Sequence, residues 1–269
     1  MKVLALVCVR NEELNISRCL DDWIRDGCDV LLIDNDSDDR TVEIARSYLG
    51  RGLLAIERLP WKGYFSLKDQ LVLKDDIIRE MRHDWVVHAD ADESFRGPWS
   101  GQSLAAAVER VDAQGYSCIN FREIVFAPWP WQDFTNADYA RHMDTYYLFE
   151  PRHPRLLRAW RRDLAAHNIN SGGHLLDGTG LKVCPQDFYL CHYIVLSLDH
   201  ACRKYLGRQF DPDEVALGWH YNRLSIAADR LALKPSPFLK RLHRWDAADF
   251  DCTTPSKTHF WEWGELPRG

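Results

Sequence analysis

The stretch VLALVCV at residues 3–9 is continuously apolar and rich in valine. Such a run predicts a strand buried on both faces of a parallel sheet, because a strand with one face in water would alternate polar and apolar side chains. Apolar positions at helical spacing follow over 16–24, and further strands are expected over 30–33 and 53–56 with another helix between them. The order strand, helix, strand, helix, strand predicts an α/β fold with helices on both faces of the sheet.

The alternation continues beyond these elements. A helix is expected over 66–81, and the run over 85–89 predicts a fourth strand that leads directly into Asp90. Less regular strands and helices are expected over 116–125, 188–196, 198–208 and 214–233. Ligands of such sheets bind beyond the carboxyl ends of the strands. The polar residues that follow the first, second and fourth strands are therefore expected to meet in one crevice.

The composition is that of an ordinary globular protein. The 269 residues are 46% hydrophobic and 28% charged, and a formal net charge of -6 predicts no general attraction to nucleic acid. The eight cysteines include no CxxC pair, so neither a disulfide framework nor a zinc site is indicated. The first apolar run is too short for a signal peptide, and no stretch reaches the about 20 apolar residues of a membrane helix. We expect a cytoplasmic protein.

The segment HADADE at 88–93 is the sharpest chemical feature. Asp90 and Asp92, on backbone that is just leaving a strand, could share one Mg²⁺ or Mn²⁺ ion, since these cations prefer oxygen ligands. His192 lies in an apolar run and could supply a third ligand, or it could be a core histidine with a partner. An isolated DxD is also common as a solvated acidic turn, so the context has to decide.

Two other polar segments follow predicted strands. IDNDSDDRT at 33–41 offers carboxylates and amides that suit a nucleobase and ribose hydroxyls, and VRNEE at 9–13 follows the first strand. Either segment could instead be a capping turn or a helix start. In combination, however, the order and spacing of the three motifs are far more specific than any one of them.

This combination resembles the nucleotide-sugar-binding half of family-two glycosyltransferases of the GT-A fold, over residues 1–95. HYxxxS at 192–197 with Lys204 is similar to a branch related to family-ninety-two enzymes and extends the resemblance to about residue 210. The resemblance implies a mixed, mainly parallel sheet flanked by helices in a domain over 1–210, with a nucleotide-sugar half over 1–95 and an acceptor half over 96–210. A helical, aromatic C-terminal extension would cover 211–269.

The resemblance also implies roles for individual residues. A divalent metal, Mn²⁺ or Mg²⁺, would be held on the donor diphosphate, and cationic side chains would stabilise that leaving group. The metal ligands would be Asp90, Asp92 and His192. The nucleotide-binding residues would be Val9, Arg10, Asn11, Glu12, Asp34, Asn35, Lys68, Asp90, Ala91 and Lys204. The pattern departs from the common one at Asn35, where a second aspartate is usual, and at Asp36 and Arg40, where glycines are usual.

The implied reaction is an inverting displacement at the anomeric carbon, with a general base that removes the proton of the acceptor hydroxyl. Candidates for that base are Asp177, Asp187 and His174. A UDP-sugar is the favoured donor, and the acceptor would be a glycan or a lipid-linked molecule, with peripheral membrane contact through the aromatic tail as one option.

Competing hypotheses are a nucleotidyltransferase, a phosphatase with an aspartyl nucleophile, and an inactive carbohydrate-binding scaffold. The first would need a glycine-rich turn after the first strand, which VRNEE lacks. The second would carry DxD after the first strand rather than the fourth, and the third would have lost its metal ligands.

Overall fold

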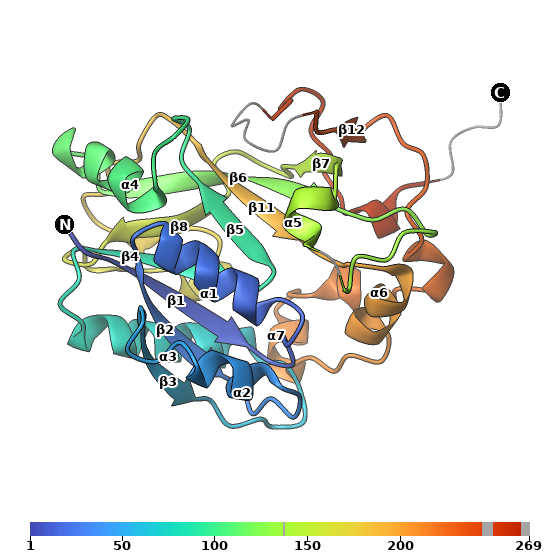
Figure 1. The fold of residues 1–269 in the computed structure, drawn as a ribbon, viewed down its shortest axis with the longest axis horizontal. Coiled ribbons are helices and arrows are strands. Elements are labelled where there is room, and N and C mark those ends of the chain that lie inside the picture. Colours follow the sequence, from blue (N-terminus) through green and yellow to red (C-terminus); the bar gives the residue numbers. More distant parts are fainter. Residues whose placement is uncertain (137, 244–249, 265–269) are drawn as a thin grey trace.

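The computed structural model of the protein describes residues 1–136, 138–243 and 250–264. Within these residues one ten-stranded mixed sheet runs in the order β12-β7-β6-β8-β4-β1-β2-β3, and β11 joins β6 to the short β5 (Figure 1). Its strands are β1 Val3–Val9, β2 Asp29–Asp34, β3 Leu53–Arg58, β4 Trp85–Asp90, β5 Glu93–Arg96, β6 Cys118–Phe126, β7 Thr145–Phe149, β8 Leu156–Arg161, β11 Phe188–Tyr193 and β12 Lys240–Arg241. A separate pair is formed by β9 Ala166–His167 and β10 Asp177–Gly178.

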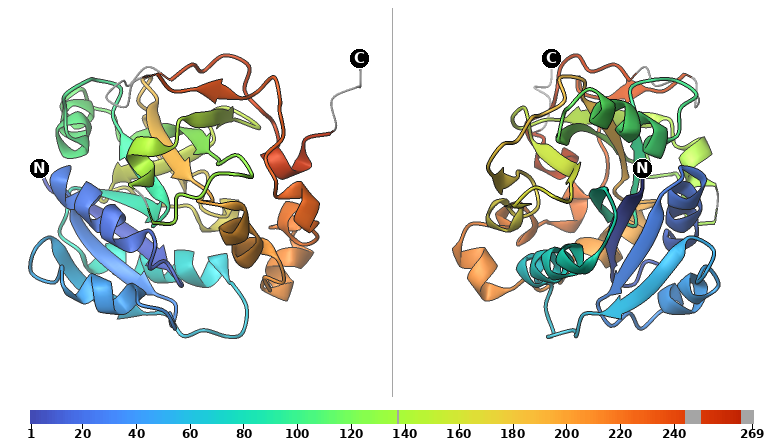
Figure 2. Two further views of the ribbon diagram at one scale, coloured as in Figure 1. Left: turned by 45° about the vertical axis from the view of Figure 1, so that its right-hand side comes forward. Right: turned by 90° about the vertical axis from the view of Figure 1, so that its left-hand side faces the viewer.

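Helices cover both faces of the N-terminal part of this sheet. In the right-hand view of Figure 2, α1 and α2 lie on one side of the strands and α3 lies on the other. The helices in the described residues are α1 Ile16–Arg25, α2 Thr41–Arg46, α3 Leu67–Glu80, α4 Leu104–Ala113, α5 Tyr139–His142, α6 Leu198–Tyr205 and α7 Pro212–Ala216. The predicted α/β class with a mixed sheet flanked by helices is confirmed.

The first strand is buried on both faces, as its composition predicts. Val3, Ala5 and Val7 belong to a core cluster with residues of α1 and α4. Leu4 and Leu6 belong to a second cluster with residues of α3 on the opposite face. Because two separate cores need the apolar side chains of this one strand, it has no position at which a polar residue would be tolerated.

Parallel pairing sets the position of the loops. β1 pairs in parallel with β2 and with β4, so that Val9 lies beside Asp34 and Cys8 beside Asp90. The polar residues after these strands therefore leave the sheet at the same edge, as expected. Beyond β4 the sheet is mixed, because β8 pairs antiparallel with both β4 and β6, whereas β11 pairs in parallel with β6.

The helix expected over 214–233 is wrong. α7 ends at Ala216, and Gly218 follows with a φ of +82°, a left-handed conformation that breaks the helix and that glycine adopts without strain. The chain then continues through short 3₁₀ turns at Tyr221–Arg223 and Ala228–Arg230. Similarly, β11 and α6 end three residues earlier than expected, at Tyr193 and Tyr205.

All eight cysteines have free thiols, in agreement with their scattered spacing. Among the described residues, no helix has the length and apolar character needed to cross a membrane.

Candidate active site

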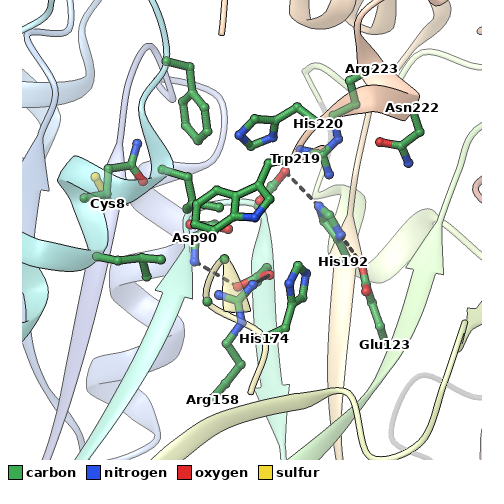
Figure 3. Close-up of a pocket in the computed structure, with 18 of the residues that line it drawn as sticks. Cys8, Asp90, Glu123, Arg158, His174, His192, Trp219, His220, Asn222 and Arg223 are labelled. Atoms are coloured by element: carbon green, nitrogen blue, oxygen red, sulfur yellow. Dashed lines mark hydrogen bonds and ion pairs between the residues drawn. The ribbon is translucent and has the colours of Figure 1, made fainter. Parts of the chain in front are cut away.

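A cavity of about 400 Å³ opens at the carboxyl ends of β1 and β4. Val9, Arg10 and Glu12 line it from the β1 side, and Asp90 and Asp92 line it from β4. The opposite walls come from β6, β8, β11 and the segment after α6, with the loop 171–174 below (Figure 3). A volume of this size accommodates a small-molecule substrate.

The loops after β1 and β2 are joined by hydrogen bonds. Arg10 Nη1 donates to the carbonyl of Asn35 at 2.7 Å, and its guanidinium stacks over Trp61 at 3.9 Å. The Asn11 side chain donates to Asp38 at 2.7 Å. Asp34 and Asn35 are buried but do not line the cavity; Asp34 accepts from the Ser37 amide, and Asn35 donates to the Leu59 carbonyl. The structure thus brings VRNEE at 9–13 and IDNDSDDRT at 33–41 together at the rim of the cavity.

Asp92 lies at the centre of a buried polar network. Only 5% of Asp92 is exposed, and its Oδ2 accepts from Lys204 Nζ at 2.5 Å and lies 3.2 Å from His192 Nε2. On the far side of the imidazole, His192 Nδ1 lies 2.7 Å from Glu123 Oε1, and Glu123 is ion-paired to Arg155. The network links β6, β11, α6 and the turn between β4 and β5 through side chains that are far apart in the sequence.

The charges of this network stabilise one another. Lys204 and His192 hold the pKa of the Asp92 carboxyl well below its usual range. Asp92 and then Glu123 raise the pKa of His192 well above its usual value, so the ring is protonated at neutral pH. The two ring nitrogens of His192 thus contact Asp92 and Glu123.

The carboxylates at the cavity fit a divalent cation in part. Asp90 and Asp92 present hard oxygen donors, and Asp92 stays ionised. Among the described residues, no three histidine, cysteine, aspartate or glutamate side chains converge as a complete set of ligands. A Mg²⁺-like ion is often bound by one or two carboxylates together with substrate phosphates and water, and Asp90 and Asp92 match this pattern.

The predicted general bases lie in different places. Asp177 is exposed in β10, where it accepts from Asn170 Nδ2 at 2.7 Å. Asp187 pairs with His153 at 2.8 Å. Neither residue lines the cavity, whereas His174 does.

His174 is neutral in the folded protein. Its Nδ1 donates to the Ser171 carbonyl at 2.8 Å, which leaves Nε2 as an acceptor. Burial, together with Arg155 and Arg158, lowers the pKa of His174 to about 3.

His174 makes stability depend on pH. The unfolded chain binds a proton at this position below about pH 6.5, and the folded chain does so only near pH 3, so acid favours unfolding over that window. Between pH 7 and pH 4, we expect the free energy of unfolding to fall by about 2 kcal/mol more in the wild type than in His174→Gln. This figure includes a reduction for solvent screening. Urea unfolding of both proteins at the two pH values measures this difference. Equal losses would show that the ring is protonated in the folded state.

Three other predicted nucleotide-binding residues also lie outside the cavity, among them Asn11, whose side chain contacts Asp38. Lys68 is exposed, although its backbone amide donates to Glu214 at 2.6 Å. Ala91 is buried, and its carbonyl accepts from Arg18 Nη2 at 2.6 Å. Ala91 therefore shapes the turn between Asp90 and Asp92 without facing the cavity.

Several cavity residues were not predicted from the sequence. These are Lys74, Glu123, Arg208, Trp219 and Arg223. The sequence could have indicated Glu123, because a carboxylate within the apolar strand sequence CINFREIVF requires a buried partner. Arg155 and Arg158 belong to a basic stretch of the sequence that could meet phosphates, and both line the cavity. Arg158 is the extra residue where the β6–β8 register shifts, and such a bulge re-aims a side chain.

The family model described as "Glycosyl transferase family 2" matches residues 5–164. No curated protein matches the chain.

Solved structures with a similar arrangement include TarS from S. aureus, with 12% identity, a TM-score of 0.45, and coverage of 86% of this chain and 42% of that chain. TarS residues 1–349 in complex with UDP-GlcNAc has 13% identity, a TM-score of 0.44 and coverage of 87% and 76%. The mannosyltransferase PcManGT from Pyrobaculum calidifontis, in complex with GDP-Man and Mn²⁺, has 16% identity, a TM-score of 0.40 and coverage of 86% and 72%. The chain thus spans less than half of that TarS chain.

Proposed function

Because the chain belongs to glycosyl transferase family 2, we propose that it transfers a sugar from a nucleotide diphosphate-sugar to an acceptor hydroxyl. The observation that carries this proposal is the cavity at the ends of β1 and β4, in which Lys204 pairs with the ionised Asp92 and Asp90 lines the same space. A lysine and two carboxylates that could hold a divalent cation suit the binding of a diphosphate whose charge grows as the sugar leaves.

The donor would bind along the β1 side of the cavity. Arg10 and Glu12 lie at the rim beside the β2 loop, where Asp34 and Asn35 would approach the base and ribose. Lys204 would lie near the diphosphate and stabilise the negative charge that develops on it. We favour a UDP-sugar as donor and a glycan or lipid-linked molecule as acceptor.

We further propose that Asp90 and Asp92 hold a divalent cation, Mn²⁺ or Mg²⁺, with the donor phosphates and water filling the other positions. Such an ion, when bound, neutralises charge on a departing diphosphate. In this proposal His192 is a positioning residue, because its two ring nitrogens contact Asp92 and Glu123.

For the acceptor step, His174 is the best placed of the three predicted bases. Its neutral Nε2 can accept a hydrogen bond from an acceptor hydroxyl, while the Ser171 carbonyl holds the ring. Because a pKa of about 3 makes the ring a weak base, it could take the proton only if bound substrate raised that pKa. Attack from the side opposite the diphosphate would invert the configuration at the anomeric carbon.

The test is calorimetric titration of UDP and GDP into the wild type and Asp92→Ala, with Mn²⁺ or with EDTA. We expect one nucleotide to bind the wild type in a metal-dependent manner, and the variant to bind it at least about tenfold more weakly because the ligand carboxylate is gone. If UDP, GDP, CDP and dTDP all fail to bind the wild type, the transferase proposal is wrong and a scaffold role takes its place.

A further inference from the structure

The cavity carries more positive charge than its own carboxylates neutralise. Seven lysine and arginine side chains line it against five aspartate and glutamate side chains, although the chain as a whole has a formal net charge of -6. A local excess of cations in a chain of opposite net charge marks a surface that receives an anion.

Most of these cations have a carboxylate partner. Lys204 pairs with Asp92, Arg155 pairs with Glu123, and Arg158 lies 3.9 Å from Glu93. Lys74 has no ion pair among the described residues but donates to the Ala89 carbonyl at 3.4 Å. Arg208 and Arg223 also lack an ion pair, because among residues 1–136, 138–243 and 250–264 no ion pair of 4 Å or less joins a carboxylate to either guanidinium.

The two arginines lie close enough to affect each other. Arg208 stacks over Phe65 at 4.3 Å and is half-buried, and its pKa is lowered by burial and by the positive charge of Arg223. Glu12 and Asp92 act on Arg208 only in part, since its pKa stays lowered, and an anion bound between the two guanidinium groups would offset their mutual repulsion. Guanidinium groups also match phosphate oxygens in geometry.

The backbone that carries the pair is held in place. The buried Glu214 accepts from the Lys68 amide at 2.6 Å and lies 2.8 Å from His220 Nε2. Trp261 Nε1 donates to the Asn222 carbonyl at 3.2 Å. Because these contacts fix the segment from both sides, Arg223 is positioned before any ligand binds.

The position of Arg223 separates it from the loops of β1 and β2. Figure 3 shows Arg223 beside Asn222, on the side of the cavity that carries His192 and Glu123. His259, which stacks on Phe149 of β7, is also near Arg223, whose charge helps to lower the pKa of His259. This wall belongs to the acceptor half and the C-terminal extension.

We propose that Arg208 and Arg223 bind a phosphate group carried by the acceptor, which makes the acceptor a phosphorylated molecule. This inference rests on the proposed transferase function. A phosphate monoester carries a charge between -1.5 and -2 near neutral pH, which two guanidinium groups match. The donor diphosphate is the other source of the same chemistry, and the experiment separates the two.

Inorganic phosphate is titrated calorimetrically into the full chain saturated with UDP or GDP and Mg²⁺, and the affinity for the nucleotide is measured separately. The variants are Arg208→Gln and Arg223→Gln. Arg203→Gln is the matched control, since Arg203 lies on α6, outside the cavity, with a 64% exposed side chain. If Arg208→Gln fails to fold because Arg208 no longer stacks on Phe65, Arg223→Gln still tests the inference.

We expect phosphate to bind the nucleotide-loaded wild type and the control equally, and to bind each cavity variant at least about tenfold more weakly, with nucleotide affinity unchanged within about twofold. Phosphate that fails to bind the nucleotide-loaded wild type overturns the inference. So does a tenfold loss of nucleotide affinity in Arg223→Gln, because the pair would then bind the donor diphosphate. Failure of the wild type to bind any nucleotide is a separate result, which defeats the proposed function itself.

Discussion

Asp92→Asn is expected to slow the release of nucleotide diphosphate from the sugar donor by about 10²- to 10³-fold. The substitution preserves shape but removes the charge that holds Lys204 at 2.5 Å and His192 at 3.2 Å. Lys204 would then lose the partner that orients it, and a cation bound at Asp90 and Asp92 would lose an anionic ligand. The rate of donor hydrolysis is measured from the amount of nucleotide diphosphate that is released.

A spectroscopic result accompanies the loss of activity. Asp92 makes the largest favourable contribution to the raised pKa of His192, so that pKa should fall in Asp92→Asn and the ring should titrate at a lower pH in NMR spectra. Asp199→Asn is the matched control, because Asp199 lies on α6 with a 76% exposed side chain. Wild-type rates in Asp92→Asn, with an unchanged His192 titration, would rule out this network as part of the machinery.

Glu123→Ala is expected to lower the free energy of unfolding by about 3 to 5 kcal/mol. Glu123 is 6% exposed, and it contacts both His192 and Arg155. Its removal would leave two buried positive charges facing each other without the carboxylate between them. Urea unfolding followed by circular dichroism measures the loss.

Two comparisons separate charge from packing. Glu123→Gln fills the same space and should still lose most of this stability, because the missing charge is the main term. Glu150→Ala removes the carboxylate of the Arg122 pair, which is more exposed, and should cost about 1 kcal/mol or less. If Glu123→Gln were as stable as the wild type, the pair would contribute by shape alone.

The sequence pattern predicts the structure after residue 210 less well than that of the sheet. Glu214 reads as an ordinary surface residue of an amphipathic helix, yet it is buried and bonded to the start of α3. The apolar spacing predicts a helix over 214–233. Gly218 ends the helix instead, and the hydrogen bond from Trp261 to the Asn222 carbonyl holds the following segment in another conformation. Short segments of this kind draw their conformation from contacts with distant parts of the chain, which local spacing does not encode.

The sequence by itself determined the α/β class and the order of β1 to β4, because buried parallel strands need unbroken apolar runs. It also determined that 9–13, 34–39 and 90–93 meet at one edge, because the carboxyl ends of parallel strands lie together. Only the tertiary structure decided the partners of Asp92, the place of Arg158 at a bulge, and the meeting of Arg208 and Arg223 in one cavity. These contacts join residues up to 112 positions apart, as Asp92 and Lys204 are. Their geometry follows from strand register and chain crossings, and the residue types alone leave many such pairings open.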